Sequence, residues 1–541
     1  MRSMRCLYMV VTMLLLATGC RSAKAQTQTI YVAQTAAGAG NGSDCADAYA
    51  VTFINTAGNW ASSYTAGKVS PGTEVALCGT ITSTLTMEGS GTSGSVIEFY
   101  WTTGATISQP VAQGINLGSH AYLLFDGGIP CGPGTACDTV EAANNTGYAT
   151  GQAGIIEATA NGSALVNQNK TSQAFYNCVG CHDIEIRNLI IRNLYVHSSL
   201  SDSTSQADSG TFLFSCTPCA GGTISIHDLT YHDMGNAISF GSTTVAASTF
   251  QLYKFDCYHD NWCATLNGTG PRTFSEHDGH VHDANNWDTT VDAFHHNNLH
   301  IFMLNSSDSL GIYLYNILSD GNWGNCCSTS QMLFSDSGSP WVDPNNENAF
   351  NNVTVANCAA TPPSMEYSTV VSGVFANNTL LGCYGLSNNP NAIKIWADSA
   401  VGYFENNAIQ NYAQYIVANA GTTFSTLDYN AYGPIQVTGN SAWVWNGSTM
   451  ATTLAAWQTD SGGDAHAFKR SNLMMSSTGH PQNGSPLIRA GANLTSLCSG
   501  GLAPLCYDAA GNARPTTGAW DIGAYQAPAP SPPTNLTGTP R

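Results

Sequence analysis

A degenerate repeat of short apolar strands limits the folds that are open to this sequence. Apolar and polar residues alternate in these segments, as expected for strands with one buried face. The segments begin at Ile184, Thr223, Phe250, Phe274, Gly311, Ala349, Gly373 and Gly402. Their spacing falls within the roughly 20–50 residues that are typical of solenoid repeats. A solenoid repeat buries its apolar face only against its neighbours, so we expect one continuous all-β stack.

Each repeat also contains a shorter strand and a polar bend. The shorter strands are expected at residues 212–214, 236–240, 263–267, 299–304, 331–334 and 392–396. Asparagine recurs within the longer segments, as in Asn351-Asn352-Val353 and Asn377-Asn378-Thr379. Asparagine favours turns, and stacked amides can hydrogen-bond between layers. The pattern predicts the coils of a β-helix with an asparagine ladder at a bend.

Composition supports a folded chain and restricts its partners. The 541 residues are 43% hydrophobic, which is ample for a core. The net charge of −19 argues against nucleic acid or an anionic membrane surface as a partner. The net negative charge also disfavours tight binding of a polyanion, unless a local basic site outweighs the repulsion.

The first residues have the features of an export signal. Arg2 and Arg5 precede a short apolar run from Leu7 to Ala17, and Ala23-Lys24-Ala25 fits signal peptidase cleavage. Residues 1–25 are therefore expected to be a signal peptide, and the protein to be secreted or periplasmic. Lipid attachment at Cys20 is the alternative. No other apolar run is long enough to cross a bilayer, so we expect no transmembrane segment.

Cysteine usage agrees with export. Of 18 cysteines, 16 remain once Cys6 and Cys20 are set aside, and an oxidising compartment makes disulfides the default. Cys131–Cys137, Cys257–Cys263 and Cys498–Cys506 are candidate short-loop pairs. The alternative is a four-thiolate zinc site formed by the two CxxC pairs, Cys178/Cys181 and Cys216/Cys219.

The residues carry a resemblance at both ends. The segments PGTEVALCGTI (71–81) and GSGTSGSVIEF (89–99) are similar to the first coils of secreted bacterial β-helix proteins of the pectate-lyase-like superfamily. The segments 483–494 and 511–526 resemble the closing segment of that group, although Gln526 stands where the family usually has Glu. The resemblance covers roughly residues 28–526. It implies a right-handed parallel β-helix and an action on polysaccharides, but this scaffold hosts lyases, hydrolases, epimerases and adhesins.

The expected boundaries follow from the repeat. Residues 26–430 would form the right-handed parallel β-helix with its N-terminal cap, as a single domain. Residues 431–526 would form C-terminal coils and the closing segment, with a short helix within 452–462. Residues 527–541 are Pro-rich and are expected to be a mobile tail.

Histidines and acids are concentrated between Arg272 and Asn305. This stretch contains six of the chain's fourteen histidines and five acids, although only 9% of all residues are charged. Crowded titratable groups tend to have shifted pKa values and mark candidate sites. The members are His277, His280, His282, His295, His296, His300, Glu276, Asp278, Asp283, Asp288 and Asp292.

The repeats can be aligned on a recurring His-Asp dipeptide. The dipeptides His232-Asp233, His259-Asp260 and His282-Asp283 would then occupy equivalent positions on successive coils. Alternate residues of a strand face opposite sides. Val281, Leu299 and Ile301 should therefore face the core, and His280, His282 and His300 should face outward. The alignment predicts an external ladder of His232, His259 and His282.

Three interpretations of this cluster remain open. The first interpretation is structural: His and Asp only hydrogen-bond to one another at bends. In the second, they perform acid–base catalysis, either with a histidine oriented by an aspartate or with two carboxylates. In the third, His280 and His282 bind a transition metal, completed by His295, His296 or His300.

A lyase would need a base and a cation that neutralises a uronate carboxylate, and Lys254, Arg272 or bound Ca²⁺ could serve. Trp262, Trp287 and Trp323 could stack on sugars or anchor loops. The order of motifs disfavours a polygalacturonase-type hydrolase. The candidate catalytic residues, with Asp260 at their edge, are Lys254, Arg272, Glu276, His277, Asp278, His280, Asp283, Asp292, His295 and His296.

The expected function is cleavage of a polysaccharide, by a lyase or a glycoside hydrolase, in a groove on the β-helix. The alternative is a non-catalytic surface or adhesive protein that binds glycan. We expect a monomer with no cofactor beyond Ca²⁺ or a transition metal. The glycan and the bond are not determined by the sequence.

Overall fold

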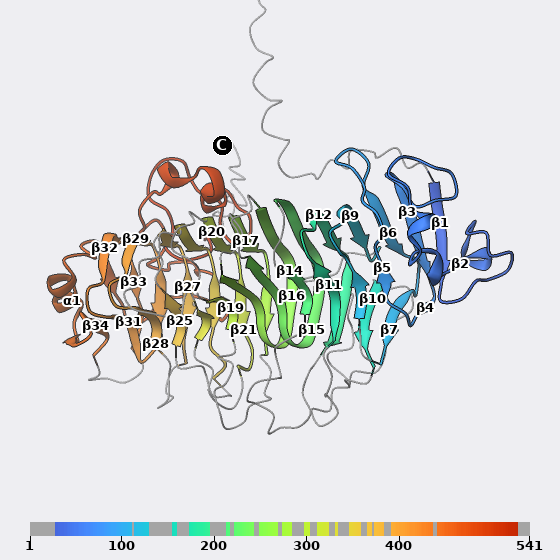
Figure 1. Cartoon of the computed structure of the whole chain (residues 1–541). Coiled ribbons are helices and arrows are strands. Elements are labelled where there is room, and N and C mark those ends of the chain that lie inside the picture. Colours follow the sequence, from blue (N-terminus) through green and yellow to red (C-terminus); the bar gives the residue numbers. More distant parts are fainter. Residues whose placement is uncertain are drawn as a thin grey trace, which may run out of the picture.

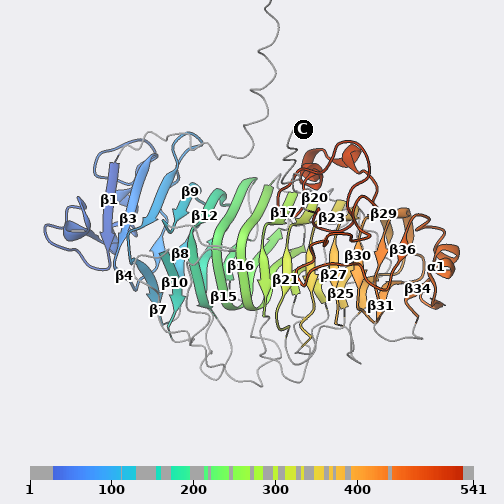
Figure 2. The same ribbon diagram turned by 180° about the vertical axis from the view of Figure 1, so that it is seen from behind.

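The computed structural model describes residues 28–110, 113–128, 154–159, 172–194, 212–216, 221–242, 248–268, 273–283, 297–302, 311–323, 330–333, 346–358, 365–369, 373–383, 391–435 and 441–527. Its strands are stacked along one long axis, from blue β1 and β3 to orange β31 and β34 (Figures 1 and 2). Each strand pairs in parallel with the equivalent strands of neighbouring coils, as β17 pairs with β20 and β20 with β23. The chain is a parallel β-helix, as the repeat and the resemblance predict.

Three parallel sheets run along the helix, and we number them by their order within each coil. The first sheet contains β1 (Gln28–Ala33), β3 (Thr73–Cys78), β6 (Ile97–Trp101), β9 (Ala121–Asp126), β12 (His182–Arg187), β17 (Thr273–His277), β20 (Gly311–Tyr315), β23 (Asn346–Phe350), β26 (Val374–Ala376), β29 (Ala400–Glu405) and β32 (Thr423–Asp428). β2 (Tyr49–Ala50) pairs beside β1.

The second sheet contains β4 (Thr80–Ile81), β7 (Thr106–Gln109), β10 (Gly154–Ala158), β13 (Leu189–Leu194), β18 (His280–His282), β21 (Leu318–Asp320), β24 (Val353–Val355), β27 (Thr379–Leu381), β30 (Ala408–Gln410), β33 (Ala431–Tyr432) and β36 (Phe468–Lys469). The third contains β5 (Leu85–Thr86), β8 (Gln113–Asn116), β11 (Gln173–Cys178), β14 (Phe212–Cys216), β19 (Asn297–Phe302), β22 (Ser330–Leu333), β25 (Met365–Thr369), β28 (Asn391–Ile395), β31 (Gln414–Ala418) and β34 (Trp443–Trp445).

Two long strands, β15 (Gly222–Ser242) and β16 (Ser248–Gly268), each pass through all three sheets. We refer to β15, β16, β17–β19 and β20–β22 as the central coils. The chain also contains β35 (Thr449–Ala451), α1 (Leu454–Ser461), and the 3-10 helices η1 (Cys45–Asp47), η2 (Val51–Phe53), η3 (Ala57–Asn59), η5 (Thr495–Leu497) and η6 (Gly500–Cys506). The helix α1 lies within the expected segment 452–462.

The core is a stack of apolar side chains inside the coils. In β17 and β20, Phe274, Ile312 and Leu314 face this interior, and each is fully buried. Val281, Leu299 and Ile301 are also buried in it, which confirms the expected facing of these three residues. The regular alternation fixes the other side chains of these strands on the outer surface.

Two bends separate the three sheets, and both use residues with positive φ. The first bend, between the first and second sheets, has Asn188, Asp228, Lys254, Asp278, Asn316, Asn351, Asn377 and Asn406 in this conformation. The second bend, between the second and third sheets, has Asn193, Asp233, His259, Asp283 and Asn411. Asn and Asp tolerate the left-handed region better than other non-glycine residues, which explains why they recur in the repeat.

An asparagine ladder follows the first bend toward the C-terminus. The fully buried Asn378 donates through Nδ2 to Asn407 Oδ1 at 3.1 Å, and Asn407 donates to Asn430 Oδ1 at 3.0 Å. Asn430 in turn donates to Asp464 Oδ1 at 2.8 Å. The expected stacking of amides between coils is confirmed at these positions.

The closing segment folds back onto the outer face of the first sheet. Leu494, Leu505 and Trp520 are buried against Phe350 and Val374. The red C-terminal segment lies beside β20, β23 and β29 in both views (Figures 1 and 2). This segment therefore covers the first sheet on one side of the central coils.

Five described disulfides join parts of this structure. Two of them, Cys257–Cys263 and Cys498–Cys506, are predicted pairs. Cys178 and Cys181 are bonded to each other, so these sulfurs are not zinc-binding thiolates. The remaining pairs are Cys45–Cys78 and Cys358–Cys383. The predicted Cys131–Cys137 pair lies outside the described residues, as do the predicted signal peptide, Cys20 and residues 528–541 of the predicted tail.

Within the described ranges, no helix is long and apolar enough to cross a membrane.

Candidate functional site

The central coils bring together about half of the predicted site residues. Lys254, His277, Asp278, His280 and Asp283 lie on β16, β17, β18 or the bends that follow them. All five have side chains that are at least partly exposed. Four candidates fall outside the described residues: Arg272, Asp292, His295 and His296; Asp288 and Trp287 do too.

The predicted external ladder has a different register. His232 pairs with Tyr258, and Tyr258 pairs with His282. The prediction that His259 belongs to this column is wrong, because His259 occupies the second bend with a φ of 54°. Its ring reaches back to Asp233, with 3.5 Å between Nδ1 and Oδ1. Aligning the dipeptide by its letters missed the one-residue shift between these coils.

A His-Asp dipeptide recurs as one local structure. In each pair the aspartate takes positive φ, and its Oδ2 meets the Nδ1 of the preceding histidine ring at 2.6–2.8 Å. The pairs are His182-Asp183, His227-Asp228, His232-Asp233, His277-Asp278 and His282-Asp283. This repetition on different coils supports the structural interpretation of each individual pair.

Stacked rings form a second regular feature on the first sheet. His227, Tyr253, His277, Tyr315 and Phe350 follow one another with ring centroids 4.4–5.1 Å apart and interplanar angles of 8° or less. The ring faces within this column are occupied by their neighbours. A sugar therefore cannot stack on those faces, although it can reach ring edges and the polar atoms beside them.

Charged side chains accompany this column along the first bend. Lys254 is 58% exposed, and its Nζ lies 3.8 Å from Asp228 Oδ1. Burial opposes ionisation of Asp278, but His277, Asn316 and Lys254 outweigh it and lower the pKa of Asp278. Farther along the sheet, Arg187 is held by Asp126 at 2.7 Å and by Glu185 at 2.6 Å. We name Lys254, His277, Asp278 and Asp228 the bend row.

A two-histidine cluster lies on the outer surface of the second sheet, on β16 and β18. Asp256 of β16 pairs with His280 of β18, and its Oδ1 lies 3.3 Å from both His280 Nδ1 and His282 Nε2. The two rings are stacked with centroids 4.3 Å apart. The opposite nitrogens face other carboxylates: His280 Nε2 lies 2.8 Å from Asp320, and His282 Nδ1 lies 2.7 Å from Asp283.

The charges of Asp256, His280 and His282 depend strongly on one another. Burial opposes a charge on His280, but Asp256 and Asp320 outweigh it and raise the pKa of His280 to about 9. Burial also favours neutral Asp256, yet the two imidazoles lower the pKa of that carboxyl to about 2. Asp256 is therefore a carboxylate at neutral pH. It bridges two histidines and is half-buried on the outer surface.

Two of the predicted acids, Glu276 and Asp260, are buried and cannot reach the outer surface. Glu276 faces the interior of the helix and is fully buried, and burial raises its pKa to about 8 despite the nearby Asn298 amide. Asp260 is also buried and accepts the Met234 N–H at 2.7 Å. Strand alternation turns Glu276 inward, between Leu252 and Leu314 of the adjacent coils. Neither acid can contact a substrate on the outer surface.

His300 and two tryptophans are separate from the two-histidine cluster. His300, predicted to face outward as a third metal ligand, is buried on the third sheet, where its ring contacts Trp262 edge-on. Trp323 is buried and donates through Nε1 to the Asp320 carbonyl at 2.8 Å. Trp323 thus anchors a turn, and His300 does not join His280 and His282.

The sequence analysis missed Asp256 and Asp320, which complete the two-histidine cluster. Asp256 belongs to the strand FQLYKFDCYHD, which was aligned one residue out of register. With the correct register, Asp256 falls opposite His280. Asp320 ends the next strand of the same sheet, opposite His282.

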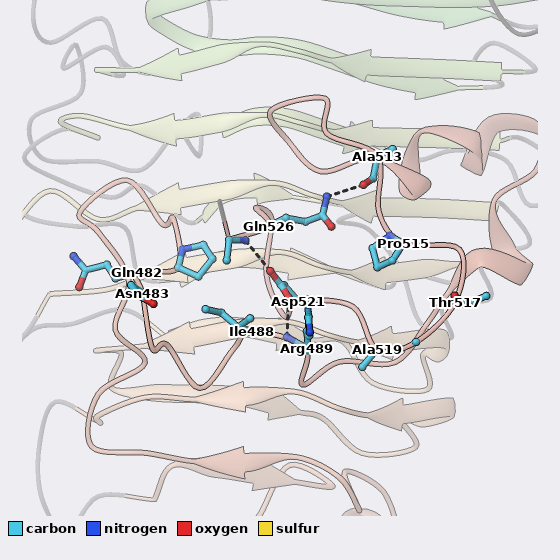
Figure 3. A pocket seen from close by; sticks show the side chains of 13 residues that line it. Gln482, Asn483, Ile488, Arg489, Ala513, Pro515, Thr517, Ala519, Asp521 and Gln526 are labelled. Atoms are coloured by element: carbon cyan, nitrogen blue, oxygen red, sulfur yellow. Dashed lines mark hydrogen bonds between the residues drawn. The ribbon is translucent and has the colours of Figure 1, made fainter. Parts of the chain in front are cut away.

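A hollow of about 1420 Å³ lies elsewhere, in the closing segment. Figure 3 shows its lining, in which the Asp521 carboxylate accepts the backbone N–H of Arg489 and Gln526 is bonded to Ala513. Asp521 Oδ2 also accepts the Ala527 N–H. These polar groups hold the segment together, and the described lining offers no acid–base pair. The hollow is therefore a weaker candidate than the central coils.

Comparison with known proteins adds similarity in fold only. No protein-family model matches the sequence, and no curated protein matches it. Among solved structures, a GH136 lacto-N-biosidase from Eubacterium ramulus aligns with a TM-score of 0.40 and 11% identity, over 82% of this chain and 67% of that one. Pectate lyase Pel9A aligns with a TM-score of 0.36 and 13% identity, over 93% of this chain and 97% of that one. No residue role is transferred from either.

Proposed function

We propose that this protein is a secreted carbohydrate-active enzyme that cleaves a polysaccharide on the outer surface of the central coils. The observation that carries the proposal is the bend row. There, the exposed amine of Lys254 lies beside Asp228 and contributes to keeping Asp278 ionised. His277 lies next to it and is oriented by Asp278 at 2.8 Å. Side chains that can transfer protons thus meet solvent on the outer surface of adjacent coils.

Among the described carboxyl groups, the charge states favour elimination over hydrolysis. A glycoside hydrolase needs one carboxyl group that stays protonated to donate to the leaving oxygen. The sequence suggests Asp278 with Asp283, or Asp288 with Asp292, for this pair, and the second pair lies outside the described residues. Burial favours their neutral forms, but His277 and His282 outweigh it and lower the pKa of each carboxyl. Both are carboxylates at neutral pH, so neither is a suitable proton donor.

A lyase instead needs a base beside the substrate and a cation at its carboxylate. Lys254 has the exposure and the position for the base, with His277 as the second candidate. Arg272, outside the described residues, remains the candidate from the sequence for neutralising a uronate.

The test is an assay on a panel of acidic and neutral polysaccharides with two detections. Unsaturated products absorb ultraviolet light and indicate elimination, whereas new reducing ends without that absorbance indicate hydrolysis. We expect an acidic glycan to give the ultraviolet signal. Absence of both signals across the panel would contradict the enzyme proposal.

A second candidate function is glycan binding without cleavage. It is favoured by the repeated His-Asp structure, because five described histidines use Nδ1 to hold a neighbouring aspartate. A binding protein would be retained by an immobilised glycan of the panel and would release no product. If the protein is retained by the glycan and releases no product, glycan binding replaces the enzyme proposal.

A further inference from the structure

We propose that Asp256, His280 and His282 form a binding site for a divalent transition metal such as Zn²⁺. This inference goes beyond the proposed function and does not depend on it. The three residues come from two adjacent strands of the second sheet, and their potential ligand atoms all lie within 4.8 Å of one another. Two imidazoles and one carboxylate are a donor set that suits Zn²⁺ and other first-row divalent metals.

The spacing of the ligand atoms agrees with a common metal centre. Asp256 Oδ1 lies 3.3 Å from His280 Nδ1 and 3.3 Å from His282 Nε2. Bonds of about 2.0–2.1 Å to a tetrahedral Zn²⁺ place neighbouring ligands roughly 3.3–3.4 Å apart. The two distances therefore match two edges of a zinc tetrahedron. The distance between the two ring nitrogens is within 4.8 Å, so the third edge can close on an ion by rotation of the stacked rings.

Asp256 Oδ1 has ion-pair contacts to both imidazoles but, among the described residues, no hydrogen bond. This oxygen is buried, and no described donor meets it with hydrogen-bond geometry, although both ring nitrogens approach it. A buried oxygen of this kind is costly unless it is paired. A metal ion bound between this oxygen and the two ring nitrogens would satisfy all three at once.

In both histidines, the ring nitrogen that faces away from Asp256 contacts a carboxylate, as is usual for histidines that bind a metal. His280 Nε2 meets Asp320 at 2.8 Å, and His282 Nδ1 meets Asp283 at 2.7 Å. A histidine that binds a metal usually donates its other ring N–H to a carboxylate or carbonyl group, which fixes the tautomer and the ring orientation. Asp283 is itself fixed by the Asn322 N–H at 2.7 Å.

The charge balance also favours a cation. Asp256, Asp283 and Asp320 surround two imidazoles, and the whole chain has a net charge of −19. His280 keeps 28% of its side-chain surface exposed and Asp256 keeps 22%. A bound metal would therefore retain a position open to water or to an oxygen of a ligand.

The experiment measures metal binding by the purified full-length chain without any glycan. After removal of metal with a chelator, the protein is titrated with Zn²⁺ by calorimetry and with Co²⁺ by visible absorption, which reports the coordination geometry. We expect one strong site per chain and a Co²⁺ spectrum of low coordination number. The variants Asp256→Asn and His280→Gln should each lose this site while keeping the wild-type circular dichroism spectrum.

Two further variants make the test specific. Asp320→Asn changes only an outer carboxylate and should weaken Zn²⁺ binding by roughly 10- to 100-fold. His182→Gln is the matched control, because His182 forms the same His-Asp pair with Asp183 on another coil. It should bind Zn²⁺ as the wild type does. A wild-type protein that binds no Zn²⁺, or an Asp256→Asn protein that binds it unchanged, would overturn the proposal, whatever the glycan assay shows.

Discussion

At the residue scale, the positive-φ positions decide how polar side chains are presented. Asp228, Asp278 and Asp283 each take φ between 49° and 53°, and each turns its carboxylate back onto the preceding histidine. The ring of the preceding histidine is thereby fixed beside the bend. Because Nδ1 of each ring contacts the aspartate, Nε2 can contact another partner.

His227 provides a test of this pairing by pH. Burial lowers its pKa, but Asp228 and Glu185 outweigh burial, so the pKa of His227 is raised above 6.5 in the folded protein. Tyr253 stacks on its other side. A raised folded pKa stabilises the protein fully below the unfolded pKa, and this contribution is lost as pH rises through the folded pKa. We therefore expect His227→Gln to destabilise the protein more at pH 5.5 than at pH 9.

The measurement is chemical denaturation of both proteins at the two pH values. Taking the difference between wild type and variant cancels the titration of other groups. A difference in unfolding free energy that is equal at both pH values, or larger at pH 9, would show that His227 is not held as an imidazolium by these carboxylates.

At the scale of single elements, the asparagine ladder holds the first bend on consecutive coils. Asn407 donates to the Phe375 carbonyl and to Asn430, and its Oδ1 accepts the Asn378 N–H at 3.0 Å. The fully buried Asp464 ends this ladder, where it also accepts from Tyr432 at 2.6 Å and Trp457 at 2.8 Å. The ladder thus runs without interruption from β24 to the C-terminal coils.

Replacing Asn407 by Ala should leave several buried groups without partners. Each buried donor or acceptor that loses its partner costs about 1–3 kcal/mol, so we expect a loss of roughly 2–4 kcal/mol. Hydrogen exchange should become faster at the amides of Asn352 and Asn378. Asn483→Ala, at an exposed position, is the control and should change neither quantity. Unchanged exchange at Asn378 in the Asn407→Ala protein would contradict the role of the ladder.

At the scale of the whole molecule, each coil contacts only its neighbours over most of the length. Stability in such a solenoid is close to a sum of local terms. Cys358–Cys383 connects adjacent coils beyond β24 and β27. The closing segment adds a distant contact, because Arg514 donates to Asn351 at 3.1 Å and to the Gly523 carbonyl at 3.0 Å.

Removing the Cys358–Cys383 disulfide should therefore have a local effect. The double variant Cys358→Ser/Cys383→Ser should lose about 2–4 kcal/mol, with faster hydrogen exchange in β24 and β27. The double variant Cys45→Ser/Cys78→Ser, at the far N-terminal end, should leave exchange in these two strands unchanged. Equal acceleration by both variants would show that the coils unfold together.

The fold could be predicted because it is repeated many times in the sequence. Alternation placed Val281, Leu299 and Ile301 correctly in the core, and recurring asparagines marked the first bend. Register was harder, because one residue of slip exchanges the inner and outer faces of a strand. That slip hid Asp256 and misplaced His259. Treating Glu276 as a surface acid was a different error, since the same alternation turns it inward.

The site proposed for cleavage can be examined by comparing two lysine variants on the most active glycan of the panel. Lys254→Met removes the exposed amine of the bend row, whereas Lys394→Met removes a lysine that lies over Trp396 near the C-terminal end of the helix. General acid–base groups typically contribute 10²–10⁴-fold to a rate. We predict that Lys254→Met lowers kcat by about that factor with an unchanged circular dichroism spectrum, and that Lys394→Met keeps the wild-type rate. A wild-type rate in Lys254→Met would contradict cleavage at the bend row.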